Sequence, residues 1–151
     1  MALEVATFGP LPLVVSPMRR TRETASAIEA RLHVTPRLEP AVGEIPAPLG
    51  VSTLAERASW LQAAMEGRWP DLGPEHQQWR ADLLAALRAM TADAIVVTHF
   101  VAINVAVGEA VGDNRVKLFS PGLCSRTVVR LGTDGRLDVV RWGPSDGAEI
   151  L

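Results

Sequence analysis

The sequence predicts an α/β domain in which a parallel or mixed sheet lies between helix layers. Residues 94–98, Ala-Ile-Val-Val-Thr, form a continuous apolar and mostly β-branched run, which is typical of a parallel strand covered on both faces. A shorter apolar run at 11–15 precedes an amphipathic pattern at 17–32, where apolar residues recur at helical spacing. Strand and helix therefore alternate along the chain, and this order favours a mostly parallel sheet.

The first strand and the first helix meet at Ser16-Pro17. A serine N-cap followed by proline is a start signal, so we expect the helix to begin at Pro17 and assign Ser16 no chemistry. Residues 33–38 predict a second strand, which its proline restricts to a short or edge position. The segment 39–50 is rich in proline and glycine and predicts a loop.

Two helices are predicted in the middle of the chain. Thr53 and Glu56 have the spacing of a capping box, which starts a helix that runs to about Gly67. Its expected apolar stripe consists of Leu54, Ala58, Leu61 and Met65. Residues 75–90 predict the next helix, whose apolar side holds Trp79, Leu83, Leu87 and Met90. We expect the tryptophans of this region to belong to the core: Trp60, Trp69 and Trp79.

The last third of the chain predicts one more helix and a hairpin. Residues 100–111 form an apolar helix closed by Gly112. The alternating runs 126–131 and 136–142 are joined by Gly-Thr-Asp-Gly, which is the pattern of a β-hairpin. No linker divides the 151 residues, so a single domain over 1–151 is expected.

Composition excludes several classes of function. The formal net charge of -2 gives no basic surface, so no nucleic-acid partner is expected. Cys124 is the only cysteine, which excludes an internal disulfide and a cysteine metal site; we expect it to be a small buried hydrophobe in a reducing cytoplasm. There is no signal-peptide pattern and no membrane-length apolar run, so a soluble cytoplasmic protein without a membrane partner is expected. The sequence contains no cluster of carboxylates and histidines at the spacing of metal ligands, so no metal site is predicted. No cofactor is predicted either.

Two strand-to-helix junctions carry residues suited to hold an anion. Arg20 lies in the first predicted turn of 17–32, and His99 directly precedes the helix 100–111. Ligands of open α/β sheets gather outside the carboxyl ends of the strands, where helix N-termini favour negative charge. A guanidinium grips phosphate oxygens bidentately, and a histidine beside a bound anion is held protonated. Together Arg20 and His99 predict a phosphate pocket.

The exact residues carry a family resemblance. Residues 16–25, SPMRRTRETA, resemble the SPLxRTxQTA segment of the histidine phosphatase superfamily, the phosphoglycerate-mutase-like proteins. Residues 97–104, VTHFVAIN, are similar to the family's second-histidine segment, and the Glu44-Ile-Pro loop lies between the two as it does there. The resemblance covers roughly residues 1–143. It implies a three-layer α/β/α sandwich with a mixed, mostly parallel sheet.

The resemblance also implies a two-step phosphoryl transfer. A histidine near the N-terminus of the family attacks phosphorus, and water or a second substrate resolves the phosphohistidine. Arg20 matches the arginine that binds the phosphoryl oxygens, and His99 matches the second histidine, which neutralises charge on the transferring group. Glu44 is the candidate general acid and later base, with Glu39 as a nearby competitor. Phe100 stands where the family often has glycine beside the phosphate, and it is counted among the phosphate-binding residues.

One departure bears directly on catalysis. The family's opening strand ends in an Arg-His-Gly segment that supplies the nucleophile, and the 151 residues contain no such segment. We therefore expect the domain to be N-terminally incomplete, with that strand belonging between 94–98 and the antiparallel strand of the tail. His33 and His76 lack the required context and are expected on the surface.

The sequence leaves several functional readings open. The first is a phosphomonoester hydrolase acting on a small phosphorylated substrate, impaired in the chain as it stands. A phosphoglycerate mutase is less favoured, because mutases of this type carry longer insertions. The alternatives are a non-catalytic phosphate-binding member and a fragment that pairs with another chain; a homo-oligomer also stays open.

Overall fold

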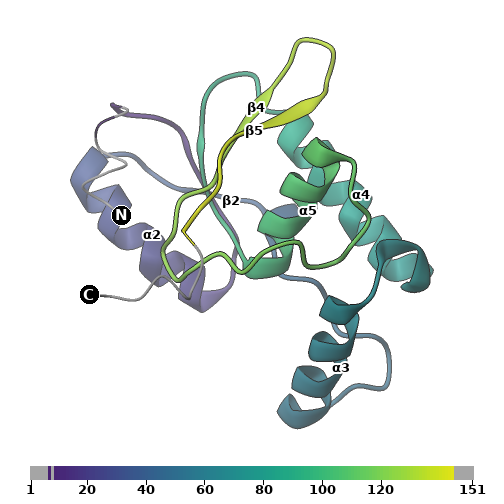
Figure 1. Cartoon of the computed structure of the whole chain (residues 1–151). Coiled ribbons are helices and arrows are strands. Elements are labelled where there is room, and N and C mark those ends of the chain that lie inside the picture. Colours follow the sequence, from purple (N-terminus) through teal and green to yellow (C-terminus); the bar gives the residue numbers. More distant parts are fainter. Residues whose placement is uncertain (1–6, 8, 145–151) are drawn as a thin grey trace, which may run out of the picture.

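The chain folds into three layers around a small parallel sheet, with a separate hairpin beside it (Figure 1). The computed structural model describes residue 7 and residues 9–144. Strand β1 (Leu13–Val15) lies at the centre of the three-stranded sheet, between β2 (Arg37–Leu38) and β3 (Ile95–Val97). Both neighbours run parallel to β1, with Val14 opposite Val96 and Val15 opposite Val97. The predicted α/β class and the edge position of the second strand are confirmed.

The two faces of β1 belong to two different cores. Leu13 and Val15 pack with Ala25 and Ile28 of helix α2 (Arg19–Leu32) on one face. Val14 points the other way, into the larger core, because successive residues of a strand face opposite sides. That core contains residues of helices α4 (Pro74–Arg88) and α5 (Phe100–Val111), so helices cover both faces and the three-layer prediction is confirmed.

Helix α2 begins two residues later than its sequence signal indicates. The helix starts at Arg19 and its N-cap is Met18, which makes no side-chain capping bond. The N-cap prediction for Ser16 is therefore wrong, because the Ser16 backbone N–H still donates to Val97 O of the neighbouring strand at 3.0 Å. Pairing with β3 keeps Ser16 in the extended conformation, and the helix can form only after Pro17.

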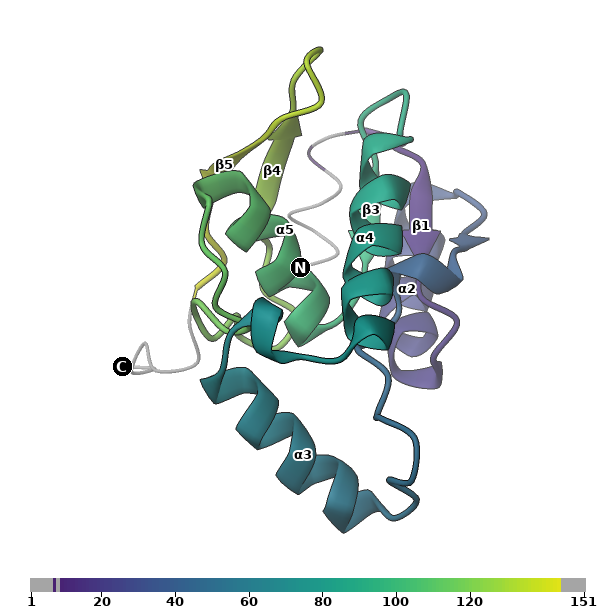
Figure 2. The same cartoon turned by 90° about the vertical axis from the view of Figure 1, so that its right-hand side faces the viewer.

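Helix α3 (Leu54–Glu66) projects from the body of the protein (Figure 2). Thr53 and Glu56 form the predicted capping box, so this start signal is confirmed. The predicted apolar stripe is wrong for its first half, because Leu54 and Ala58 are exposed and Ala64 is the buried residue of the helix. A capping box fixes where a helix starts, but burial depends on what the rest of the fold places against it. The preceding 39–53 segment is a loop that contains one 3-10 turn, η2 (Pro40–Val42).

The tryptophans and helix α5 follow the sequence prediction. Trp69 in the 3-10 turn η3 (Trp69–Asp71) is buried, and Trp60 and Trp79 pack partly buried against the same core. Helix α5 has the predicted bounds. Its C-cap Gly112 adopts φ 70°, a left-handed conformation that glycine reaches without steric cost.

The predicted hairpin is also present. Strands β4 (Val128–Leu131) and β5 (Leu137–Arg141) pair antiparallel and pack against α5. Within residue 7 and residues 9–144, however, they form their own sheet and do not hydrogen-bond to β3.

Strand β3 has one open edge in this arrangement. The Ile95 N–H and the Val97 carbonyl bond toward β1, so the N–H and C=O of Val96 point to the opposite edge, where the described residues provide no partner strand. All three residues of β3 are only half-buried. The prediction of a strand covered on both faces is confirmed, because Val96 packs against the larger core and Ile95 and Val97 pack against the smaller one. The remaining exposure of β3 lies along its open edge.

Three expectations about single residues have clear outcomes. His33 is exposed as predicted, whereas His76 is buried, which contradicts the surface prediction. Cys124 is exposed and not buried as expected, since it lies in an irregular turn with φ 55° and not in the core. No helix in the described part of the chain is long and apolar enough to cross a membrane.

The smaller core under α2 should tolerate truncation poorly. Replacing Ile28, which is buried to 1 % exposure, with alanine removes three buried carbon groups and leaves a cavity, so Ile28→Ala should lower the free energy of unfolding by about 2–4 kcal/mol. Leu49→Ala, at a fully exposed position, should change it by less than about 0.5 kcal/mol. Urea unfolding followed by circular dichroism measures both, and equal effects would contradict the assignment of this core.

Candidate functional site

The parallel pairing of β1 with β3 brings two polar residues together at the carboxyl end of the sheet. Ser16 directly follows β1, and His99 follows β3 after Thr98. Both are buried, and His99 Nε2 lies 2.7 Å from Ser16 Oγ. Two residues 83 positions apart in sequence therefore share one hydrogen bond.

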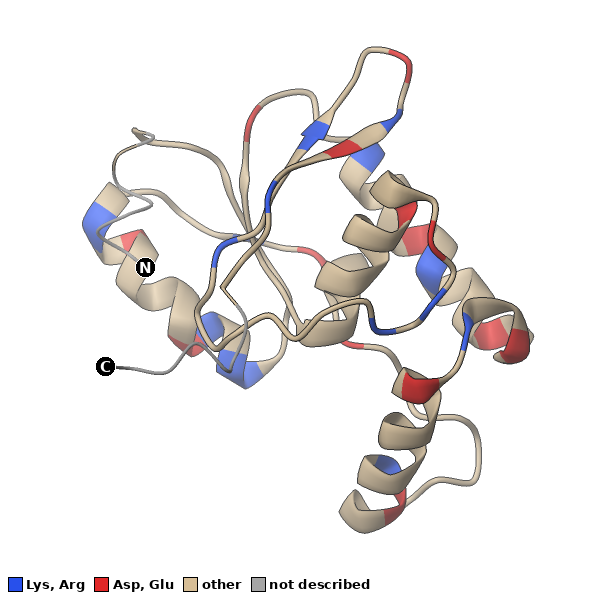
Figure 3. Cartoon of the chain, in the orientation of Figure 1, with Lys and Arg blue, Asp and Glu red and all other residues tan. Residues whose placement is uncertain are grey.

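Arg20 completes a short chain of hydrogen bonds. Its Nε donates to His99 Nδ1 at 3.1 Å from the first turn of α2. Because Nδ1 accepts this bond, the proton of the neutral imidazole lies on Nε2, which donates to Ser16. His99 is 4 % exposed while Arg20 is open to solvent, so the guanidinium forms the outer side of the site. Figure 3 shows the arginines gathered at this end of α2.

His99 is held neutral in this arrangement. Burial, and to a smaller extent the positive charge of Arg20, lower the pKa of its imidazole to about 4. The protonated form expected from the sequence requires an anion beside the ring, because only a nearby negative charge offsets the guanidinium. The site thus pairs a permanent cation with a histidine that can become one.

Glu44 lies at the N-terminus of α5. Its Oε1 accepts from the backbone N–H of Val101 at 3.3 Å and from that of Ile45 at 3.1 Å. Burial raises the pKa of the Glu44 carboxyl, opposed by these two hydrogen bonds and by the charges of Arg20 and Arg57. Desolvation is the largest of these effects, so the carboxyl keeps a proton to higher pH than an ordinary glutamate.

The N-terminus of α5 supplies further donors. Phe100 is the first residue of the helix, and the N-cap residue His99 makes no side-chain capping bond. The first N–H groups of a helix have no partner within it and carry its positive dipole end. Phe100 is half-buried and packs against the larger core, which fixes the backbone at this point.

The structure brings Arg20, His99, Phe100 and Glu44 to one end of the sheet, while Glu39 is engaged elsewhere. The Glu39 side chain caps η2 and pairs with Arg37 at 2.8 Å. The hydrogen bond to α5 belongs to Glu44 alone of the two.

Sequence reasoning missed three residues that build the site. The sequence around Ser16 indicates an N-cap and gives no sign that its hydroxyl contacts His99. Thr98 Oγ1 donates to Val42 O at 2.6 Å and ties the Glu44 loop to the end of β3. Asn104 is fully buried, and its Oδ1 accepts from the backbone N–H groups of Leu118 and Phe119. A buried asparagine at the centre of an apolar helix was the available signal for this last contact.

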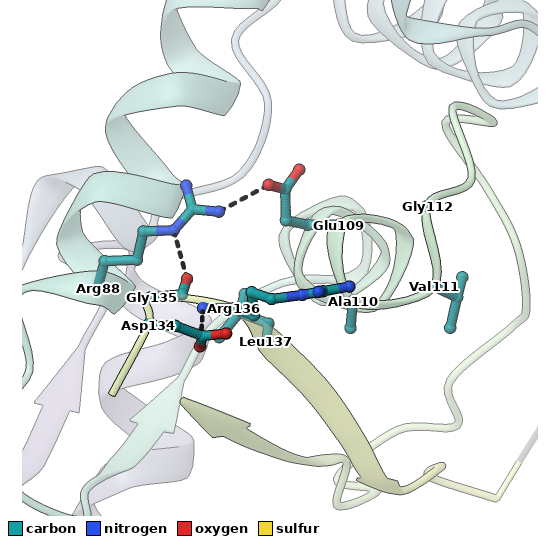
Figure 4. A pocket seen from close by; sticks show the side chains of 9 residues that line it. All are labelled: Arg88, Glu109, Ala110, Val111, Gly112, Asp134, Gly135, Arg136 and Leu137. Carbon is teal, nitrogen blue, oxygen red and sulfur yellow. Dashed lines mark hydrogen bonds and ion pairs between the residues drawn. The ribbon is translucent and has the colours of Figure 1, made fainter. Parts of the chain in front are cut away.

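The described residues provide no metal site, and their cavity lies away from His99. Among the residues that the structure describes, no group of three or more His, Cys, Asp or Glu side chains could hold a metal ion. A cavity of about 610 Å³ lies at the opposite end of α5, between its last turn and the hairpin (Figure 4). Its wall includes Arg88, which is already paired with Glu109 at 2.6 Å. The cavity is about a full helix length from His99 and is separate from the site described above.

The sequence matches a family of known proteins. Residues 2–144 match the family model of the histidine phosphatase superfamily (branch 1). The match spans both strand-to-helix junctions and the Glu44 loop. A search of curated proteins found no match.

The charge state of His99 should be measurable directly. We expect its imidazole to titrate near pH 4 in the phosphate-free protein, as followed by NMR. Because the unfolded chain binds this proton at about pH 6.5, the folded state loses stability as pH falls from about 6.5 to 4. Arg20→Met should raise the midpoint by removing the guanidinium charge, while the exposed neighbour Arg22→Met should leave it unchanged. A midpoint at or above 6.5 in the unsubstituted protein would contradict the buried, neutral assignment.

Proposed function

Since the chain belongs to the histidine phosphatase superfamily, we propose that it binds a small phosphate ester at the Arg20–His99 pocket and serves phosphoryl transfer to water. Membership of this superfamily supports a function of the phosphatase or mutase type. The observation that carries the proposal is the 3.1 Å contact between Arg20 and His99 at the N-terminal end of α5.

Arg20 has the free donors that a phosphate needs. Its Nε is taken by His99, but its two Nη groups make no hydrogen bond within the described part of the chain. A guanidinium presents such donors in a planar fork that matches two phosphate oxygens. Arg20 therefore grips the phosphoryl group from the solvent side in this proposal.

His99 becomes a donor when the anion binds. A dianionic phosphate beside the imidazole opposes the effect of Arg20 and raises the histidine pKa. Nδ1 then gains a proton, gives up its bond from Arg20 and donates to a phosphoryl oxygen. Ser16 keeps the ring oriented through Nε2 while this happens. The backbone N–H of Phe100 adds a donor at the helix terminus.

Glu44 serves as the general acid. Its raised pKa favours the protonated carboxyl, which can pass its proton to the leaving oxygen as the ester bond breaks. The resulting carboxylate then accepts a proton from the water that attacks the phosphohistidine. The carboxyl gives one proton to the leaving oxygen in the first step and regains one from water in the second. It therefore ends the cycle protonated, as it began.

The nucleophile comes from a strand beside the open edge of β3. The three histidines of the sequence are His33, His76 and His99, and none lies in an Arg-His-Gly segment. We propose that such a segment, supplied from outside residues 9–144, pairs with Val96 between β3 and the hairpin. Acid–base help alone is worth about 10²–10⁴ in rate, far less than phosphate monoester hydrolysis requires. The pocket therefore binds phosphate by itself and turns it over only with the added histidine.

A second candidate function is non-catalytic phosphate binding. The absence of an Arg-His-Gly segment favours it, as does the fact that both nitrogens of His99 already have partners. Such a member keeps the anion pocket without forming a phosphohistidine.

Inorganic phosphate should bind to the chain in a manner that depends on Arg20. Arg20→Met removes the bidentate donor, so the affinity should fall about tenfold or more. Arg22→Met, which removes an equal charge on an exposed neighbour two residues away, should change it by less than about twofold. Isothermal titration at low salt measures both, and equal losses would show general charge attraction in place of a pocket.

Hydrolysis of an aryl phosphate should require the added strand. The chain as given should show no turnover above buffer, while a form extended upstream with an Arg-His-Gly strand should hydrolyse the ester through a phosphohistidine. In that form Glu44→Gln should lower kcat about 10²–10⁴-fold for a poor leaving group. Turnover by the chain alone would refute the external nucleophile. Inactivity of both forms, with phosphate still bound, would favour the binding function.

A further inference from the structure

We propose that His76 is a positioning residue for Glu44, because its Nε2 holds the carbonyl of Pro46 and thereby the loop that carries the carboxyl. The chemical use of that carboxyl rests on the proposed function, but its placement by His76 does not. His76 lies in the first turn of α4, far in sequence from the Arg20 and His99 junctions.

His76 is a buried residue that makes a hydrogen bond through one ring nitrogen. The side chain is 2 % exposed, and Nε2 lies 3.1 Å from Pro46 O. Because a carbonyl only accepts, Nε2 carries a proton and donates it to Pro46. Among the described residues Nδ1 has no hydrogen-bond partner, and Glu75 Oε1 lies 3.4 Å away. An apolar side chain would fill this space without leaving a polar atom unpaired, so the bond to Pro46 is what a histidine adds.

The ring is also held in orientation. Trp60 of α3 stacks on the His76 imidazole, with ring centroids 5.0 Å apart and planes inclined by 27°. This contact fixes the plane of the imidazole and aims Nε2 at the carbonyl. It also links the projecting helix α3 to the same point of the loop.

The loop around Glu44 depends on bonds of this kind. Val42 O accepts from Thr98 and Ile45 O accepts from Arg57 Nη2. With His76, three carbonyls of residues 42–46 therefore accept from side chains of α3, of α4 and of the residue that follows β3. The loop belongs to no sheet, and its carbonyls have no ladder partner. Side chains replace the regular backbone bonds and set where Glu44 points.

His76 is the cleanest of these contacts to test. The charge of Arg57 lowers the pKa of the Glu44 carboxyl, so a substitution there changes electrostatics as well as position. Thr98 adjoins His99 in sequence. His76 contacts the loop at the Pro46 carbonyl and acts on Glu44 through the backbone of two intervening peptide units.

The Val101 amide reports where the Glu44 carboxyl lies. Val101 is the second residue of α5, so its N–H has no partner inside the helix and bonds to Glu44 Oε1 instead. The Ile45 amide bonds to the same oxygen. Hydrogen exchange at these two amides therefore measures the placement of Glu44 whether or not the protein is an enzyme.

Two substitutions separate the hydrogen bond from the packing. His76→Phe keeps an aromatic ring on Trp60 but removes the donor, while His76→Gln removes the ring and keeps an N–H donor at a similar reach. We expect His76→Phe to speed exchange at Val101 and Ile45 about tenfold relative to the amides of α2, and His76→Gln to restore it to within about threefold. If the phenylalanine variant does not fold, His76→Met, an adaptable apolar side chain, takes its place.

The control is a core variant far from the loop. Ile28→Ala destabilises the core under α2 and should not accelerate Val101 and Ile45 relative to the other globally exchanging amides. A His76→Phe variant that behaves in the same way would overturn the proposal and make His76 a packing residue only. In the hydrolytically active extended form, His76→Phe should lower kcat more for an alkyl phosphate than for a nitrophenyl phosphate, with KM unchanged. If the amides respond and no form hydrolyses either ester, the positioning role stands and the proposed function fails.

Discussion

The parallel register between β1 and β3 is the constraint on which the site depends. Val15 lies opposite Val97, so the residues that follow the two strands leave the sheet side by side. This pairing places Ser16 against His99 and lets the first turn of α2 bring Arg20 to the other imidazole nitrogen. A shift of one residue would turn His99 toward the opposite face of the sheet, because side chains alternate along a strand.

The electrostatics of the site follow from that placement. A guanidinium lies in contact with a buried imidazole. Without an anion the imidazole stays neutral, because a second positive charge there would be both desolvated and repelled by the guanidinium. In the proposed function a bound anion interacts favourably with both groups, because its negative charge offsets the guanidinium and favours the protonated imidazole.

A third segment, which has little regular secondary structure, carries the proposed acid group. Glu44 lies on a loop whose carbonyls are held by side chains from three other elements, and its carboxyl caps α5 across the gap. Burial raises the pKa of this carboxyl while these contacts fix its direction. Position and protonation state therefore have a common origin in the packing of the loop under α3 and α4.

The sequence by itself determined the features that depend on neighbouring residues: the bounds of α5, the Thr53–Glu56 capping box, the hairpin and the motif residues Arg20 and His99. Tertiary structure alone decided which of the predicted groups are buried and what they contact. The local sequence predicts an N-cap at Ser16, but a hydrogen bond to β3 keeps this residue with the strand. It predicts a surface position for His76, but this side chain is enclosed by α3 and the Glu44 loop. Local patterns record propensity and periodicity, whereas burial and hydrogen-bond partners depend on segments distant in the chain.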